Sequence, residues 1–392
     1  MYKNHMNNNI NKISIPLAVT LLMFPQIIET MYSPALTSIK THFGVTGSTA
    51  AQGMSVFFIA FAIGVVFWGR MCDIIGRRYA TLIGLILFIS SAIITLFAST
   101  FTLLLIGFGC CAFGAAVGSV CTQTILRDCY QGAELGRVFS IIGTSIGISP
   151  IIGMITGSWL TVNGGYKWVF IGMIILTSGL LCWSLLQLPE TKPTQTQQDS
   201  LLSVGTKMLK DLHIWYIMLM VAIFNIALFS YYSLAPFMFE KLYVSIKLFG
   251  YTSAVLALGS ILGAMLNMRL LRRHVMAQTI ITAASIILLI SSVSVYLLQT
   301  SIWFFLPMIF ISLSFGLALP NLLSTALNNY RDHLGTAGAL LGLFYYLIIG
   351  AGLHKAAIVG DLGITLIVCA ILAITLTLFH YINKTVSIRP AR

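Results

Sequence analysis

Long apolar runs separated by short polar stretches recur along the whole chain of 392 residues. The hydrocarbon core of a membrane is about 30 Å thick, and an α-helix needs roughly 20 apolar residues to cross it. The pattern therefore predicts twelve membrane-spanning helices, at 14–36, 49–68, 79–98, 102–126, 136–160, 166–188, 213–235, 247–268, 276–298, 301–326, 335–354 and 361–382.

The longest polar break, residues 189–212, divides these spans six and six. "GRMCDIIGRR" follows span 2, and a weaker copy, "NMRLLRR", follows span 8 at the matching place. Transporters are often built from such repeats, with the substrate site between them. We therefore predict an all-α polytopic membrane protein with two pseudo-symmetric six-helix halves, 1–188 and 213–392, joined by a cytoplasmic linker at 189–212.

The composition agrees with a membrane protein: 58% of the residues are hydrophobic, 8% are charged, and the mean hydropathy is +0.95. So little charge could not cover a soluble protein of this size. The polar start, "MYKNHMNNNINK", leads directly into a full-length span. We interpret it as a cytoplasmic tail and not as a targeting peptide.

The net charge of +12 could suggest nucleic acid, but its distribution indicates membrane orientation instead. With both termini in the cytoplasm, 17 of the 22 Lys and Arg residues fall in inner segments. Positive charge in short loops stays inside, so this pattern predicts a multi-pass protein of the inner (cytoplasmic) membrane that contacts anionic lipid.

Other classes of function find little support in the sequence. The seven cysteines fall in apolar runs or inner loops, include no CxxC pair, and are expected to serve packing and not a disulfide framework. A Walker motif and a cluster of catalytic or metal-ligating residues are also missing from the sequence. We expect neither an enzyme nor a bound cofactor or metal.

The segment "GRMCDIIGRR" concentrates charge in a chain that has little of it. Membrane orientation alone accounts for Arg70, Arg77 and Arg78, but not for Asp73 or for Gly69 and Gly76. Glycine permits a tight turn, and an acid at a helix end can pair with arginines and with a neighbouring helix N-terminus. The sequence predicts an ion-pair latch between helices, formed by Gly69, Asp73, Gly76, Arg77 and Arg78.

This segment resembles the signature loop of the major facilitator superfamily, with Ile74 in place of the usual basic residue. Other segments resemble the Bcr/CflA group of drug–proton antiporters: "IETMYSPAL", "ILRDCY", "SPIIG", "LPET", "GSILGAMLNMRLLRR", "GLALPN" and "GTAGALLG". The resemblance covers nearly the whole chain. It implies a monomeric secondary transporter of small molecules coupled to protons.

Glu29 is the one carboxylate well inside an apolar run. Charge at membrane depth costs at least about 2.5 kcal/mol, so an unpaired carboxyl there favours its protonated form. The resembling family also carries an acid at this place, and we predict that Glu29 couples transport to protons. The alternative is a carboxyl satisfied by hydroxyls such as those of Thr30 or Tyr32.

Two further helices match the family's pattern only in part. Pro150 interrupts span 5, where Gly147 and Gly153 are expected to allow close helix contact. The antiporter motif there is incomplete, and an ordinary packing kink is the alternative. In span 4, Phe108 and Cys111 replace the family's usual Arg and Gln, and Gln123 replaces a further Arg. That change puts standard proton coupling in question or leaves Glu29 to act alone.

Aromatic and amide side chains supply the remaining candidates for a large amphipathic pocket. Each is individually more typical of packing, and as a set they are Tyr32, Gln52, Phe58, Phe108, Asn225, Tyr231, Tyr232, Asn321 and Tyr345. The leading interpretation is an antiporter that exports small amphipathic compounds, as in multidrug efflux. The alternatives are a dedicated metabolite or siderophore exporter, a proton-independent facilitator, or a transporter-like sensor.

Overall fold

The computed structural model describes residues 12–192, 201–327, 329–330 and 334–387, and within them eleven helices are long and apolar enough to cross a membrane. One of these, α5, leaves the helical conformation at Gly164 and Gly165 and turns back, so it makes two crossings. The predicted twelve spans of an all-helical membrane protein are confirmed.

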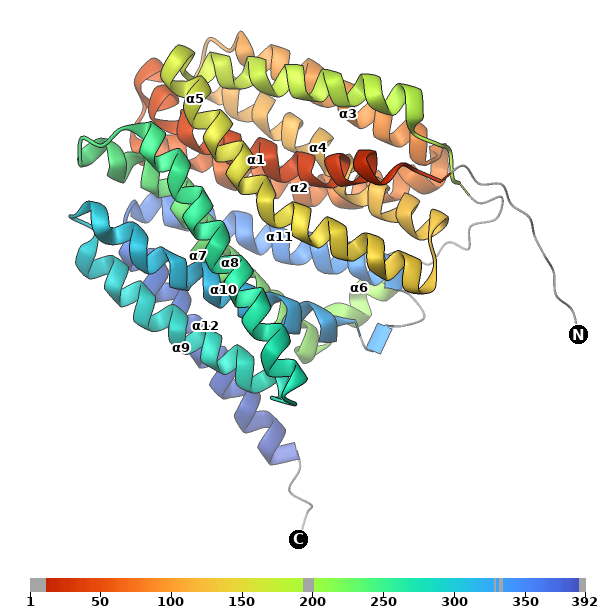
Figure 1. Ribbon diagram of the computed structural model, residues 1–392, viewed down its shortest axis with the longest axis vertical. Coiled ribbons are helices and arrows are strands. Elements are labelled where there is room, and N and C mark those ends of the chain that lie inside the picture. The colour runs from red at the N-terminus through yellow and green to blue at the C-terminus, as the bar shows by residue number, and fades with distance from the viewer. Residues whose placement is uncertain (1–11, 193–200, 328, 331–333, 388–392) are drawn as a thin grey trace, which may run out of the picture.

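The elements follow one another in the order that the hydropathy pattern predicts (Figure 1). Their bounds are α1 Ile15–Phe43, α2 Gly47–Ile75, α3 Arg77–Leu96, α4 Phe101–Cys129, α5 Gly132–Gln187, α6 Leu201–Leu209, α7 Leu212–Lys241, α8 Ile246–Arg272, α9 Ala277–Leu298, the 3₁₀ turn η1 Ile302–Phe304, α10 Phe305–Ala326, α11 Leu334–Val359 and α12 Leu362–Ser387.

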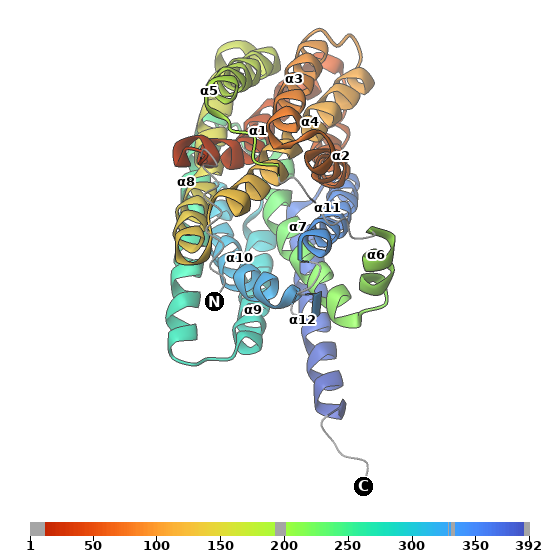
Figure 2. The same ribbon diagram turned by 90° about the vertical axis from the view of Figure 1, so that its right-hand side faces the viewer.

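Two groups of helices lie one above the other in Figure 2, α1–α5 and α7–α12. They meet where α1 packs on α7, α2 on α11 and α5 on α8. We call the end of the bundle at which α1 begins the near face, and the end at which α1 passes to α2 the far face. The predicted limits of the two halves, at 188 and 213, stay a prediction.

Serine hydroxyls join the two groups through the partner's backbone. Ser33 of α1 donates to the carbonyl of Tyr232, Ser233 of α7 donates to the carbonyl of Ala51 at 3.3 Å, and Ser55 of α2 donates to the carbonyl of Gly350 at 2.6 Å. Hydroxyl bonds of this kind stabilise helix pairs in an apolar medium, where water cannot compete.

The linker was predicted as polar, but part of it forms the short helix α6, which packs on α11. Val204 and Met208 are buried. The ammonium of Lys207 lies 5.5 Å from the centre of the Tyr330 ring, and the Tyr330 hydroxyl donates to Asp211 at 3.1 Å. Burial and the Asp211 carboxylate raise the pKa of Tyr330 to about 12, which keeps it a neutral donor. Residues 193–200 of the linker lie outside the described residues.

One expectation about the cysteines is wrong. Cys72 of α2 and Cys121 of α4 are joined by a disulfide, with their Cα atoms 6.2 Å apart. Sequence spacing could not indicate this pair, because the two residues are brought together only by the packing of two helices. The other five cysteines are free.

The glycines of span 5 divide into two kinds. A Cβ added at Gly153 would lie 2.0 Å from the Thr30 hydroxyl and 2.5 Å from the Ile27 carbonyl, so α5 and α1 approach closely there. A Cβ at Gly147 would meet nothing within 4 Å. The expectation of a close helix contact is therefore wrong for Gly147 and holds for Gly153.

Gly153→Ala should destabilise the protein by about 1–3 kcal/mol, because the new methyl group overlaps the backbone of α1. Gly147→Ala is the matched control on the same helix. It should be neutral or stabilising by up to about 1 kcal/mol, because alanine favours the helix. Thermal unfolding of the detergent-purified variants measures both effects, and equal melting temperatures for the two would contradict this packing.

Candidate functional site: a buried carboxyl between the two halves

Glu29 lies midway along α1 and is only 5% exposed. Its Oε1 atom has no hydrogen-bond partner, and no ion pair within the described part of the chain includes it. The alternative that nearby hydroxyls satisfy Glu29 finds no support. Thr30 donates to the Gln26 and Ile27 carbonyls of its own helix, and the Tyr32 hydroxyl has no partner either.

The surroundings of Glu29 come from both halves. The helix that carries it packs on α7 of the second half, where Ser33 donates to the Tyr232 carbonyl, and the neighbouring α2 packs on α11. A carboxyl at this place therefore responds to any movement of one half against the other.

Aromatic rings form a continuous chain across the boundary between the halves. The Tyr32 ring stacks on Phe108 at 3.8 Å between centroids, and Phe57 links Phe108 to Phe58. Phe58 then contacts Phe229 at 4.8 Å. We call the whole set the interface cluster; its members are Tyr32, Phe57, Phe58, Phe61, Phe108, Phe229, Tyr232, Tyr345 and Tyr346.

The structure brings five of the nine predicted lining residues into this cluster: Tyr32, Phe58, Phe108, Tyr232 and Tyr345. Sequence reasoning left Phe57, Phe61 and Phe229 out of the lining. Their signal was available, because "SVFFIAF" and "ALFSYY" place several rings on neighbouring turns of α2 and α7.

The other four predicted lining residues make their hydrogen bonds or lie outside this cluster, although the Tyr231 ring also contacts Tyr232, with 5.9 Å between the centroids. Tyr231 bonds with the Thr252 hydroxyl inside the second half, and Asn321 donates to Asn267 at 2.7 Å between α10 and α8. Asn225 donates to the Val221 carbonyl of its own helix, and Gln52 is half-buried on α2. These contacts are helix–helix and local contacts, which the sequence analysis gave as the ordinary alternative.

Phe108 occupies the position on α4 at which the resembling family carries a basic residue. Its ring is fully buried and packs on Tyr32, Phe57 and Phe170, so it fills the space with apolar contacts. Cys111 is buried beside the Phe88 carbonyl, and Gln123 donates to Ser119 on its own helix. None of the three side chains supplies a counter-ion for Glu29.

A single residue connects α2 to α3, in place of the loop that the sequence suggested after span 2. α2 runs on to Ile75 and α3 begins at Arg77, so Asp73 lies on the last turn of α2. Gly76 alone joins them, at φ +99°, a conformation that side-chain-bearing residues rarely adopt. A Cβ there would also lie 2.4 Å from Glu190.

Arg77 is the centre of this near-face cluster and is only 3% exposed. It donates to Asp128 at 3.0 Å, whereas Asp73 lies 3.4 Å away and is 38% exposed. Asp128 is 18% exposed and also accepts from Thr191. The nearest partner of Arg77 is therefore a residue that the sequence analysis did not single out.

Glu190 was missed as well. Its carboxylate accepts from the backbone N–H groups of Arg77 and Arg78, which are the first two residues of α3. Arg78 in turn donates to the Leu185 carbonyl near the end of α5 at 2.8 Å. An acid that caps a helix N-terminus stabilises it, and here the cap ties the end of α5 to the start of α3.

Two residues of the charged segment make little contact with the rest of the protein. Gly69 has only ordinary contact with Val120, and Arg70 is exposed.

Comparison with known proteins decides the family. The sequence profile described as Major Facilitator Superfamily matches residues 19–353. The chain belongs to the major facilitator superfamily. It is therefore a membrane transporter and not an enzyme, with a small-molecule substrate.

Two curated relatives are similar to this chain. A protein of Rickettsia bellii described as an uncharacterized transporter is 30% identical over 358 residues, which cover 87% of this chain and 89% of that protein. Multidrug resistance protein D of Escherichia coli is 24% identical over 185 residues, 47% of each chain. Among solved structures, a bacterial homolog of the human lysosomal transporter Spinster matches with a TM-score of 0.71 at 14% identity, over 94% of this chain and 96% of that one, which supports the fold.

Asp128→Asn should destabilise the protein by about 1.5–3 kcal/mol, because the buried Arg77 guanidinium loses its nearest carboxylate and keeps only Asp73 and the Cys72 carbonyl. Asp73→Asn should cost about 1 kcal/mol or less, since Asp73 is more distant and more exposed. The melting temperatures of the purified variants measure the difference, and a larger loss for Asp73→Asn would contradict this geometry. Asp73→Asn should still slow transport at a normal membrane level, as the latch predicts.

Proposed function

We propose that this transporter is a secondary active exporter of small amphipathic compounds, driven by the inward movement of protons. It acts as a monomer in the inner membrane with both termini in the cytoplasm. The excess of Lys and Arg in the segments at the near face supports this orientation. The similarity to multidrug resistance protein D supports drug export as the activity.

The buried carboxyl of Glu29 is the observation that carries the proposal. A carboxyl without a counter-ion at membrane depth is favoured in its neutral form, and it becomes charged when a cation approaches or when water reaches it. A proton and a cationic substrate then compete for the same group. This exclusion is the simplest form of antiport, because the two ligands favour different states of one site.

The interface cluster provides the rest of the binding surface in this proposal. Aromatic faces attract cations, with about 2 kcal/mol or more per contact when water is excluded. They also accept flat apolar groups of varied shape without fixed hydrogen bonds. Tyr32 and Phe108 from one half and Tyr232 and Tyr346 from the other would enclose a bound molecule next to Glu29.

A second candidate function rests on Phe108. The resembling antiporters carry a basic residue at this place in span 4, and here the fully buried ring leaves Glu29 without a partner. A facilitator that does not use protons, or a sensor built on the transporter fold, fits that loss. Within export, a dedicated metabolite or siderophore remains the alternative substrate to drugs.

Glu29→Gln should abolish export against a concentration gradient, because the amide resembles the protonated carboxyl and cannot release a proton. Substrate flux in proteoliposomes, with and without an imposed pH gradient, measures this for wild type and variant. Glu134→Gln, on the exposed ion pair with Lys12, is the control and should transport normally. Equal gradient-driven flux in Glu29→Gln and wild type would remove Glu29 from the coupling step.

If wild type itself ignores the pH gradient while still moving substrate, the protein is a facilitator and the Phe108 observation is the better guide. Coupled transport by wild type that Glu29→Gln loses supports the antiporter.

A further inference from the structure

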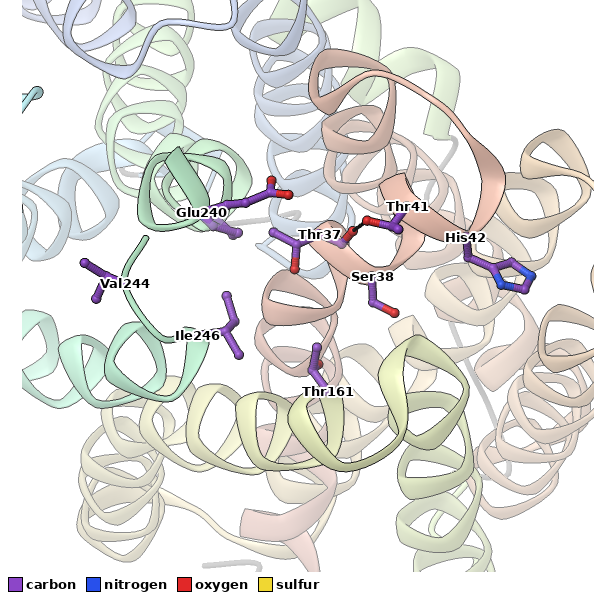
Figure 3. A pocket seen from close by; sticks show the side chains of 9 residues that line it. Thr37, Ser38, Thr41, His42, Thr161, Glu240, Val244 and Ile246 are labelled. Carbon is purple, nitrogen blue, oxygen red and sulfur yellow. Dashed lines mark hydrogen bonds between the residues drawn. The ribbon is translucent and has the colours of Figure 1, made fainter. Parts of the chain in front are cut away.

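A pocket of about 550 Å³ with polar and apolar walls opens at the far face, between the two halves. Its walls come from the last turns of α1, from α5, from the end of α7 and from the segment that leads into α8 (Figure 3). The volume lies within the range of small-molecule sites. The residues that line it are Thr37, Ser38, Thr41, His42, Thr161, Pro236, Glu240, Val244 and Ile246.

The hydroxyl groups of this pocket are arranged to accept hydrogen bonds. Thr41 donates its proton to the Thr37 carbonyl at 3.0 Å, and Thr161 donates to the Gly157 carbonyl at 2.7 Å. A hydroxyl has one proton and two lone pairs, so each of these oxygens has lone pairs left for a ligand. In Figure 3, Thr37 and Thr161 lie on opposite sides of the space, and the ring of His42 points away from it.

Glu240 adds a negative charge to this acceptor-rich wall. Both of its oxygens accept from the ammonium of Lys40, at 2.8 and 2.9 Å, so α7 and α1 are joined across the boundary. The two side chains remain partly open to solvent, at 34% and 40% exposure. An exposed pair of this kind is worth about 1 kcal/mol or less, so another cation can displace Lys40.

Val244, Ile246 and Pro236 form the apolar side of the same space. A ligand that fits must therefore donate hydrogen bonds at one end and present an apolar body at the other. A protonated amine with a small hydrophobic group has this chemistry, and Glu240 of the lining already binds an ammonium, that of Lys40.

We propose that this pocket is a second binding site, for a protonated primary or secondary amine whose ammonium replaces that of Lys40 on Glu240. Displacement of Lys40 breaks an ion pair between the two halves. The site thereby links the presence of an amine at the far face to the opening of that face. The proposal goes beyond the function proposed for Glu29 and does not require it.

The test uses the purified full-length protein in lipid nanodiscs, with 2-phenylethylamine as the probe and calorimetric titration as the measurement. The wild type is titrated once for reference, and all other samples carry Glu29→Gln, so that binding at the buried carboxyl does not contribute to them. Lys40→Gln frees Glu240 and should tighten binding roughly threefold to fivefold. Glu240→Gln removes the charged acceptor and should weaken binding about tenfold or more.

Two controls separate this site from general effects of charge. Lys12→Gln removes an ion pair of the same 2.8 Å length outside the pocket, and it should leave the affinity unchanged. The N,N,N-trimethyl analogue of the probe has the charge but no N–H donor, and it should bind at least several-fold more weakly. Thr161→Val keeps the shape of the side chain and removes one acceptor, so it should weaken binding of the amine by about fivefold.

Several results would overturn the proposal. Unchanged or weaker binding in Lys40→Gln, or equal binding of the amine and its trimethyl analogue, would show that Glu240 and its neighbours do not select an ammonium. Loss of all amine binding in the Glu29→Gln background, with binding present in the wild type, would place the only amine site at Glu29. That outcome would reject this second site and leave the proposed antiport intact.

Discussion

A buried carboxyl with an unpaired oxygen, and with no ion pair among the described residues, is the constraint on which the centre of this transporter depends. Glu29 is buried on α1, a helix that packs on α7 of the other half, in a medium where an unpaired charge is costly. Its protonation state must therefore follow the arrangement of the halves around it. The fold holds this helix closely: α5 packs on α1 at Gly153, and the Tyr32 ring of α1 stacks on Phe108 of α4.

Contacts between α1 and α7 hold the two halves together at their boundary. Ser33 of α1 and Ser233 of α7 each donate to a backbone carbonyl of the opposite half. Lys40 of α1 and Glu240 of α7 form an ion pair across the same boundary at the far face. Movement of one half against the other at the far face therefore acts on this ion pair.

Hydropathy predicted the spans because a membrane requires continuous apolar helices, and the acid in span 1 was visible because its charge is rare at that depth. The hydrogen-bond and ion-pair partners of individual side chains could not be predicted in the same way. Arg77 pairs most closely with Asp128, and Glu190 caps α3, because helices far apart in the sequence end at one face. Tyr231 and Asn321 point into the second half, since a helix position alone does not say which neighbour a side chain meets.

Proton release on substrate binding tests the central claim most directly. The purified protein in weakly buffered solution, mixed with a lipophilic cation such as tetraphenylphosphonium, should release close to one proton for each molecule bound, because the cation and the proton compete for Glu29. A pH indicator dye measures the release, and Glu29→Gln should bind the cation more weakly and release none. Wild-type binding without proton release, or equal release from Glu29→Gln, would contradict the account.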